Sequence, residues 1–324
     1  MWTFTQRIFG LLQFTRLALV FTAIADSLCA LLLRGGPRAR PDPILAAAVA
    51  LTSAGLYGFG MSLNDIIDRR RDYQLAAHRP LPSGRIGVAT AHVVCILLGA
   101  AAILASAFYA GNARELGWLS FALVVWVVAL IFFYDLAGKY LVAPGLLTLG
   151  LIRFFHATFP APELPVLWHP LLLLNHVTII STVAYAWEEK RPQLTRIHWW
   201  AVVGGLALVD ATAILIVGWH RGLRLNSGLS LPASAAIWFI VAAVLIGKFA
   251  PTRRIAGQRL MLCGLLWLIV YDAAFVAVYV SWPAAGLIAL LLPTAYLAVL
   301  VMRWWNHIIA LSHRPQFQRP GREQ

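Results

Sequence analysis

The chain alternates long apolar runs with short polar connections from near its start to about residue 303. Each run has 17 residues or more, close to the roughly 20 apolar residues that a helix needs to cross a bilayer. None shows the strict two-residue alternation of a membrane barrel strand, so helices are predicted. The ten runs are 17–33, 44–64, 87–110, 116–134, 141–158, 167–187, 199–219, 232–249, 260–281 and 284–303.

The number of spans is expected to be nine or ten. Only Ser281-Trp282-Pro283 separates the last two runs, so they form either two spans or one span and a broken or re-entrant piece. The first run follows a 16-residue leader without a clear cleavage pattern, which favours a retained span over a signal peptide. No linker or soluble insert is visible. We therefore predict an all-α, polytopic membrane bundle in which residues 1–324 form one domain.

Composition agrees with this architecture and removes the main alternatives. The chain is 60% hydrophobic and 12% charged, with a mean hydropathy of +0.76, whereas soluble domains carry about 25% charged residues. A soluble enzyme, a disordered chain and a fibrous repeat are excluded. Cys29, Cys95 and Cys263 are scattered through apolar runs without a metal-binding spacing. We interpret them as small buried residues.

The net charge of +13 is explained by topology rather than by nucleic acid. Nineteen of the 26 Lys and Arg residues flank one side of the predicted membrane, six flank the other, and Arg153 lies inside a span. The positive-inside rule places the richer side in the cytoplasm. This multi-pass protein is therefore expected to have a cytoplasmic N-terminus, contact with membrane lipid, and no nucleic-acid partner.

The second run ends in an acidic cluster on that cytoplasmic face. At about 100° per residue, the side chains of Asn64, Asp65, Asp68 and Asp72 share a helical face about 100° wide. Three neighbouring carboxylates repel one another unless a positive group lies between them. Mg²⁺ binds oxygen ligands of this kind together with substrate phosphates. Arg71 flanks the acidic face. The alternative is a solvated helix end whose acids pair with neighbouring arginines.

The following connection strengthens the interpretation as a metal–diphosphate site. It reads His78-Arg79-Pro80-Leu81-Pro82-Ser83-Gly84-Arg85. Two prolines and a glycine restrict and turn the chain, and the arginines supply donors suited to phosphate oxygens. The acidic face and the basic loop together predict that Arg71 and Arg79 bind a diphosphate.

The pattern N-D-x-x-D-x-x-x-D followed by R-P-L-P-S-G resembles the UbiA superfamily of intramembrane prenyltransferases. The resemblance implies a helical bundle around a central cavity. It also implies that Mg²⁺ holds an isoprenyl diphosphate whose chain passes to an acceptor, often an aromatic ring. In that case Asn64, Asp65, Asp68 and Asp72 are the catalytic residues, and Asn64, Asp68 and Asp72 are metal ligands.

Two further basic residues fit the same resemblance. Tyr134-Asp135 and Lys139 close the fourth run and are similar to the Y-D-x-x-x-K of many members, where the lysine would bind phosphate. The alternative for Lys139 is an ordinary positive-inside residue. Arg153 lies within the fifth run, where an exposed charge is costly. It is predicted to bind diphosphate, and the alternative is an ion pair with an intramembrane aspartate.

A second acidic motif, which the family usually carries after the sixth helix, is degenerate here. Only Glu188 and Glu189 supply carboxylates, and Lys190 and Arg191 follow them. Glu188 is the predicted ligand of a second Mg²⁺ and Lys190 a diphosphate contact. An ion pair at the helix end is the alternative.

Taken together, these residues predict a Mg²⁺-dependent prenyltransferase. Its substrates would be an allylic isoprenyl diphosphate and a lipophilic acceptor, which we expect to be aromatic. The alternative function is a non-catalytic or transport descendant of the same fold that binds or moves an isoprenoid lipid. An ion-coupled transporter is disfavoured, because no internal repeat with interrupted helices is found. The sequence makes no prediction of oligomeric state.

Overall fold

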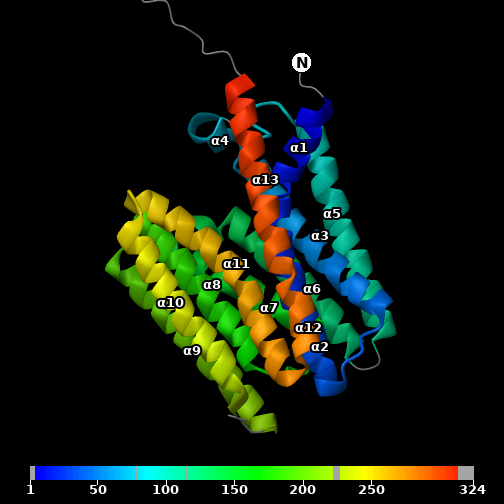
Figure 1. The fold of residues 1–324 in the computed structure, drawn as a ribbon. Helices are drawn as coiled ribbons and strands as arrows, with labels where there is room; N and C mark the ends of the chain where they lie inside the picture. The colour runs from blue at the N-terminus through cyan, green and yellow to red at the C-terminus, as the bar shows by residue number, and fades with distance from the viewer. Residues whose placement is uncertain (1–3, 78, 114–115, 222–226, 313–324) are drawn as a thin grey trace, which may run out of the picture.

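A computed structural model describes residues 4–77, 79–113, 116–221 and 227–312. They form a bundle of long helices joined by short connections (Figure 1). The helices are α1 (Phe4–Phe14), α2 (Val20–Gly35), α3 (Pro43–Ile67), α4 (Arg69–Leu75), α5 (Val88–Asn112), α6 (Gly117–Leu136), α7 (Ala143–Thr158), α8 (Trp168–Trp187), α9 (Arg196–Arg221), α10 (Ser230–Phe249), α11 (Arg253–Tyr279), α12 (Trp282–Ala289) and α13 (Leu291–Ser312). Short 3-10 turns are η1 (Leu17–Leu19), η2 (Gly36–Arg38), η3 (Gly138–Tyr140) and η4 (Ser227–Leu229).

The helices divide into an inner group and an outer group. Within the described residues, nine segments are long and apolar enough to cross a membrane. In α8, 61% of the most apolar 18-residue stretch is buried inside the protein. The same share is only 11% in α9 and 17% in α10. The exposed side chains of the outer helices are largely apolar, and a soluble protein rarely leaves such extensive apolar surface uncovered. The protein is an integral, multi-pass membrane protein.

Helix α7 also crosses the bundle, although it is too short to be counted among those nine segments. Tyr134 in α6 and Tyr185 in α8 lie within electrostatic range of each other, so both helices finish at the same end of the bundle. The connecting α7 must therefore run to the opposite end. Its 16 residues span only about 24 Å. This length suffices because ten of them are buried among other helices.

The last two apolar runs form separate crossings. Helix α11 ends at Tyr279, and the Ser281 side chain accepts a hydrogen bond from the Ala284 N–H (3.4 Å) at the start of α12. Helices α12 and α13 then make one candidate span, Trp282–Trp305. The sequence left open whether the runs on either side of Ser281-Trp282-Pro283 form one span or two. The structure shows two spans there, and the helix that departs from the usual length is α7.

Glycines permit close contact between neighbouring inner helices. A Cβ added at Gly55 of α3 would lie 2.8 Å from the carbonyl oxygen of Leu98 in α5. At Gly150 of α7 it would lie 2.7 Å from the carbonyl oxygen of Leu174 in α8. Small residues at helix contacts are typical of membrane bundles, where close packing replaces the hydrophobic effect.

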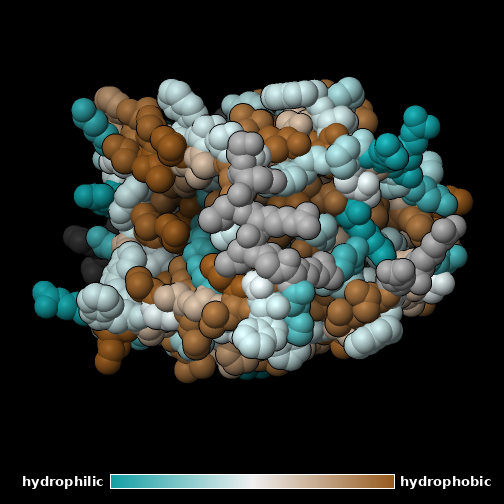
Figure 2. Space-filling model, turned by 90° about the horizontal axis from the view of Figure 1, so that it is seen from below, coloured by the Kyte–Doolittle hydropathy of each residue, from teal (hydrophilic) through white to brown (hydrophobic). Residues whose placement is uncertain are grey.

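Both ends of the described chain meet the acidic motif at one end of the bundle. Helix α1, the last part of α13 and helix α4 all lie at the top in Figure 1. The rings of Phe9 in α1 and Trp305 in α13 stack with centroids 4.0 Å apart. The opposite end carries intermixed polar and apolar residues (Figure 2). The fold thus gathers its N-terminal helix, its C-terminal helix and the α3–α4 junction around one region.

Candidate active site at the α3–α4 junction

The acidic motif spans a helix break instead of one continuous helix. Helix α3 ends at Ile67, Asp68 occupies the junction, and α4 begins at Arg69. The Asp68 N–H donates to the Asn64 carbonyl and the Asp72 N–H to the Asp68 carbonyl, both at 2.9 Å. Helical spacing is therefore kept across the break. The four predicted side chains remain on consecutive turns, but they fall into two groups that contact different cations.

Asn64 and Asp68 belong to a group centred on Lys139. Lys139 Nζ donates to Asp68 Oδ1 at 2.7 Å and lies 3.9 Å from Asp135 Oδ1. The Asn64 amide donates to the same Asp135 oxygen at 2.6 Å. The turn η3, which follows α6, thus brings Lys139, the predicted phosphate contact, to the acidic motif. The sequence did not predict that Asp135 would be the shared acceptor.

Asp65 and Asp72 belong to a second group, which contacts two arginines. Arg79 donates to Asp72 Oδ2 at 2.6 Å and lies 3.8 Å from Asp65 Oδ1. Arg16, from the segment that links α1 to η1, approaches the same Asp65 oxygen at 3.5 Å. Neither arginine makes a hydrogen bond with Asp65 Oδ1, and this buried atom has no hydrogen-bond partner among the described residues. Asp65 Oδ1 therefore forms two ion pairs but keeps its capacity to accept a hydrogen bond.

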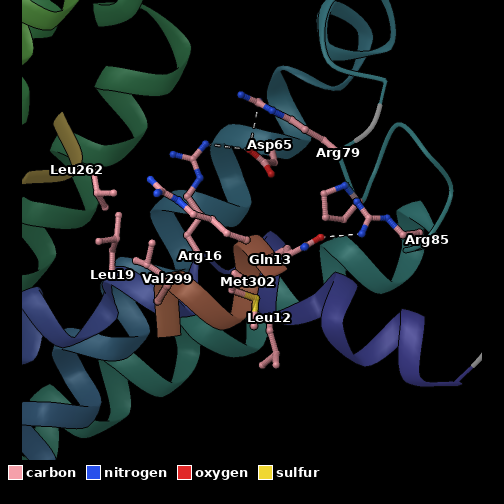
Figure 3. A pocket seen from close by; sticks show the side chains of 13 residues that line it. Leu12, Gln13, Arg16, Leu19, Asp65, Arg79, Arg85, Leu262, Val299 and Met302 are labelled. Carbon is pink, nitrogen blue, oxygen red and sulfur yellow. Dashed lines mark hydrogen bonds and ion pairs between the residues drawn. The ribbon is translucent and has the colours of Figure 1, made fainter. Parts of the chain in front are cut away.

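A cavity of about 380 Å³ opens beside Asp65. Figure 3 shows the guanidinium groups of Arg16 and Arg79 converging on Asp65, with apolar side chains from other helices nearby. The polar side chains that line it are Gln13, Arg16, Asp65, Arg79, Arg85 and Arg303. The other lining residues are Leu12, Ala18, Leu19, Pro80, Leu262, Val299 and Met302. The cavity is thus cationic on one side and apolar on the other.

The predicted rigid loop is packed into the protein. Leu81 is buried in a small core with Phe14 and Ile86, and Gly84 adopts a φ of 73°, which glycine tolerates without strain. The Arg85 guanidinium is buried and donates to Gln13 Oε1 at 2.7 Å. Burial lowers the pKa of Arg85 from its usual value. The loop therefore packs against α1 and holds that helix beside the cavity.

Arg71, Glu188 and Lys190 are placed differently. Arg71 is exposed on α4, and no hydrogen bond or ion pair is found for it within the described residues. Glu188 caps the end of α8 and pairs with Lys190 at 3.3 Å, which is the helix-end pair that the sequence offered as an alternative. No contact joins either residue to the acidic motif in the described part of the chain.

Arg153 forms a separate buried ion pair. Its guanidinium donates to Asp26 Oδ2 at 2.5 Å and to the Thr22 hydroxyl at 3.1 Å. The structure therefore places Arg153 with an intramembrane aspartate of α2, the alternative to diphosphate binding. It is not among the residues that line the cavity.

Three polar residues of the cavity, Gln13, Arg16 and Arg303, were not among the predicted site residues. Arg16 and Arg303 had been counted only as charges of the cytoplasmic side. Arg85 was expected, with Arg79, to supply donors for phosphate oxygens. Nothing in the linear sequence indicates that the two ends of the chain meet at Asp65.

The donor set fits a hard divalent cation. The two groups together offer four carboxylates and the Asn64 amide oxygen, and Mg²⁺ favours oxygen ligands. Asp65 Oδ1, which forms ion pairs with Arg16 and Arg79 but accepts no hydrogen bond, is a buried acceptor available to such an ion, since buried polar atoms in proteins are normally satisfied. Asp65, Asp68, Asp72 and Asn64 are the residues that would hold it.

Comparison with known proteins identifies the family. The UbiA prenyltransferase family model matches residues 18–187, just over half of the chain. This range includes the acidic motif, the rigid loop, Lys139 and Arg153. The chain belongs to the UbiA prenyltransferase family.

A solved structure agrees on the fold, and a second is similar at a lower score. A structure of digeranylgeranylglyceryl phosphate synthase has 16% sequence identity and a TM-score of 0.58, covering 84% of this chain and 98% of that one. A UbiA homolog from Archaeoglobus fulgidus bound to GPP and Mg²⁺ has 15% identity and a TM-score of 0.46, covering 90% of this chain and 99% of that one. At these identities the first likeness shows a shared fold. No curated protein matches the sequence.

Proposed function

We propose that this protein transfers an isoprenyl chain from an allylic isoprenyl diphosphate to a lipophilic, aromatic acceptor. The observation that supports this most directly is the cavity beside Asp65, where a buried carboxylate oxygen that accepts no hydrogen bond lies among arginines at the edge of an apolar surface. An isoprenyl diphosphate has the complementary form, a highly charged head on an apolar tail. Membership of a prenyltransferase family supports the same reaction class.

The basic residues would bind the diphosphate head. Arg16 and Arg79 face the cavity beside Asp65, and Lys139 lies against Asp68. Guanidinium groups make paired hydrogen bonds to phosphate oxygens. Mg²⁺, held by Asn64, Asp65, Asp68 and Asp72, would neutralise charge on the leaving diphosphate.

The reaction breaks the bond between the allylic carbon and the diphosphate oxygen. The electron pair leaves with the diphosphate, and the arginines stabilise its charge as it develops. The acceptor ring then forms the new bond to the allylic carbon and loses a proton to a carboxylate of the motif. Apolar lining from Leu19, Leu262 and Val299 would keep water away from the allylic cation.

We further propose that the acidic end faces the cytoplasm and that residues 1–324 act as one domain. The distribution of Lys and Arg along the sequence supports the orientation. Helices α1 and α13, from the two ends of the chain, line the same cavity, which supports the proposal of a single domain.

The test compares Asp65→Asn with wild type in proteoliposomes that contain Mg²⁺, labelled allylic isoprenyl diphosphates and candidate aromatic acceptors. Wild type should release diphosphate and form a prenylated lipid, whereas Asp65→Asn should lose most of this activity. Asp42→Asn is the matched control, because Asp42 caps the opposite end of α3 and asparagine caps equally well.

Two outcomes would contradict the proposal. Equal diphosphate release by wild type and Asp65→Asn would remove the role of this carboxylate. Movement of a labelled isoprenoid lipid between leaflets by wild type, without any diphosphate release, would identify a carrier.

A further inference from the structure

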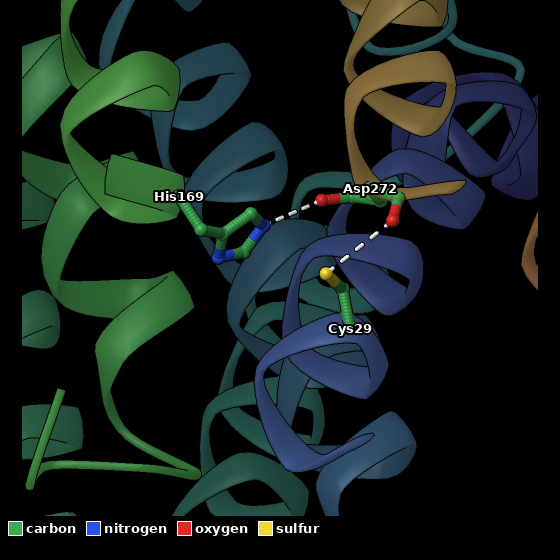
Figure 4. A group of neighbouring side chains, drawn as sticks. All are labelled: Cys29, His169 and Asp272. Carbon is green, nitrogen blue, oxygen red and sulfur yellow. Dashed lines mark hydrogen bonds and ion pairs between the residues drawn. The ribbon is translucent and has the colours of Figure 1, made fainter. Parts of the chain in front are cut away.

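A second group of chemically active side chains lies away from the cavity, towards the other end of the bundle. Cys29 of α2, His169 of α8 and Asp272 of α11 converge there, as Figure 4 shows. His169 is the second residue of α8, whose last turn lies at the acidic end. All three side chains are essentially fully buried. None of them lines the cavity beside Asp65.

The three potential ligand atoms are close enough to share one ion. The thiol sulfur of Cys29, an imidazole nitrogen and a carboxylate oxygen lie within 4.8 Å of one another. A tetrahedral ion with bonds of about 2.0–2.3 Å places its ligands roughly 3.3–3.7 Å apart. His169 Nε2 and Asp272 Oδ1 are only 2.7 Å apart. To share an ion, these two atoms would have to move apart by up to about 1 Å.

Unsatisfied carboxylate oxygens mark the same place. Asp272 Oδ2 and Asp26 Oδ1 are buried and have no hydrogen-bond partner among the described residues. Both side chains are fully buried, and the two carboxylates neighbour each other. The other oxygen of each is occupied, by His169 and by Arg153 respectively. Buried polar atoms are rarely left unpaired, so the two adjacent carboxyl groups either share a proton or bind a cation in its place.

Charge balance favours a divalent ion as that cation. Arg153 already neutralises Asp26, which leaves Asp272 without a fixed cation. A divalent ion bound to the Cys29 thiolate and the Asp272 carboxylate gives a site with no net charge. Such a site suits a low-dielectric interior, where an isolated charge is costly.

We propose that Cys29, His169 and Asp272 form a zinc-class metal site that joins α2, α8 and α11. Thiolate and imidazole ligands select Zn²⁺ over Mg²⁺, so this site differs in chemistry from the oxygen-rich site at the acidic end. Binding releases the Cys29 proton and requires neutral His169, with its proton on Nδ1. Asp26 Oδ1 is the acceptor available to a water in the fourth position.

A small void adjoins His169. It measures about 10 Å³ and is lined by residues at the ends of α2 and α7 and the start of α8. This is about the space that one water molecule needs.

The first test measures metal in the purified, tag-free protein after loading with Zn²⁺ and removal of free ion. Wild type should retain about one zinc per chain, and Cys29→Ser should retain at least about tenfold less. Cys95→Ser is the matched control and should retain zinc as wild type does, because Cys95 is buried in another core cluster. A wild-type protein without bound zinc would overturn the proposal, as would equal retention by Cys29→Ser.

The second test needs no variant and therefore does not depend on whether Cys29→Ser folds. Co²⁺-loaded wild type should show thiolate-to-cobalt charge-transfer absorption, and X-ray absorption at the zinc edge should show one sulfur together with nitrogen and oxygen ligands. Added zinc should also raise Tm. A hydrogen-bonded network that binds no metal would give neither signal and no change in Tm, which would refute the site. Neither test depends on prenyl transfer.

Discussion

Removing the Arg153 guanidinium should destabilise the protein strongly, and removing its partner as well should restore most of the stability. In Arg153→Met, the carboxylate of Asp26 loses the donor that lies 2.5 Å away. The Asp26 side chain is fully buried and that of Arg153 is only 9% exposed. Water therefore cannot replace the lost cation.

Breaking a buried ion pair from one side costs about 3–5 kcal/mol, because it leaves an uncompensated charge in a low-dielectric interior. Replacing both partners with apolar residues of similar size is often neutral. The double variant Arg153→Met with Asp26→Leu should therefore regain about 3 kcal/mol or more over Arg153→Met. At roughly 2–4 °C per kcal/mol, the single variant should unfold on the order of 10 °C below wild type.

Tryptophan fluorescence during heating of the purified protein measures these differences, and the KM for the diphosphate is measured on the same samples. If Arg153 acts only through Asp26, the double variant should have both the Tm and the KM of wild type. Wild-type stability in Arg153→Met would refute the reasoning from burial. Recovered Tm with a persistently raised KM would instead support diphosphate binding by Arg153, as the sequence predicted.

Three further changes test other parts of the structure. Lys139→Met should raise the KM for the diphosphate about 10- to 150-fold, because a charge-assisted contact contributes about 1.5–3 kcal/mol; an unchanged KM would limit Lys139 to pairing with Asp68. Gly55→Ala should destabilise the protein by about 1–3 kcal/mol, since its Cβ would meet the backbone of α5 at 2.8 Å. Gly111→Ala, with open space around it, should be neutral or stabilising by up to about 1 kcal/mol; equal Tm values for the two variants would contradict the packing. Chelation of Mg²⁺ should abolish prenyl transfer and be reversed by added Mg²⁺, and persistent transfer would exclude a metal role for Asp68.

Much of the fold could be predicted because a membrane helix satisfies its backbone hydrogen bonds within its own segment. Each span is thus a local property of about 20 residues, and the predicted runs coincide with helices throughout the described chain. Helix α7 is the instructive case. Its sequence predicted a membrane span like the others. The structure shows a shorter helix of 16 residues, most of which are buried against neighbouring helices.

The acidic site was partly predictable for a related reason. Asn64, Asp65, Asp68 and Asp72 are neighbours in sequence, and helical spacing alone keeps them close. Their division into two groups was not predictable, because Asp135 belongs to α6, Lys139 to η3 and Arg16 to the N-terminal segment. Such contacts depend on the order and rotation of helices.

The sequence by itself determined the membrane location, the helical spans and the acidic motif with its basic loop. Only the tertiary structure decided that Arg16 and Arg303 share a cavity with Asp65, that Arg153 pairs with Asp26, and that Cys29 lies beside His169 and Asp272. The physical reason is that lipid-facing and buried surfaces are both apolar here. The hydrophobic pattern therefore marks where a helix lies along the chain, but not which of its faces meets a neighbour.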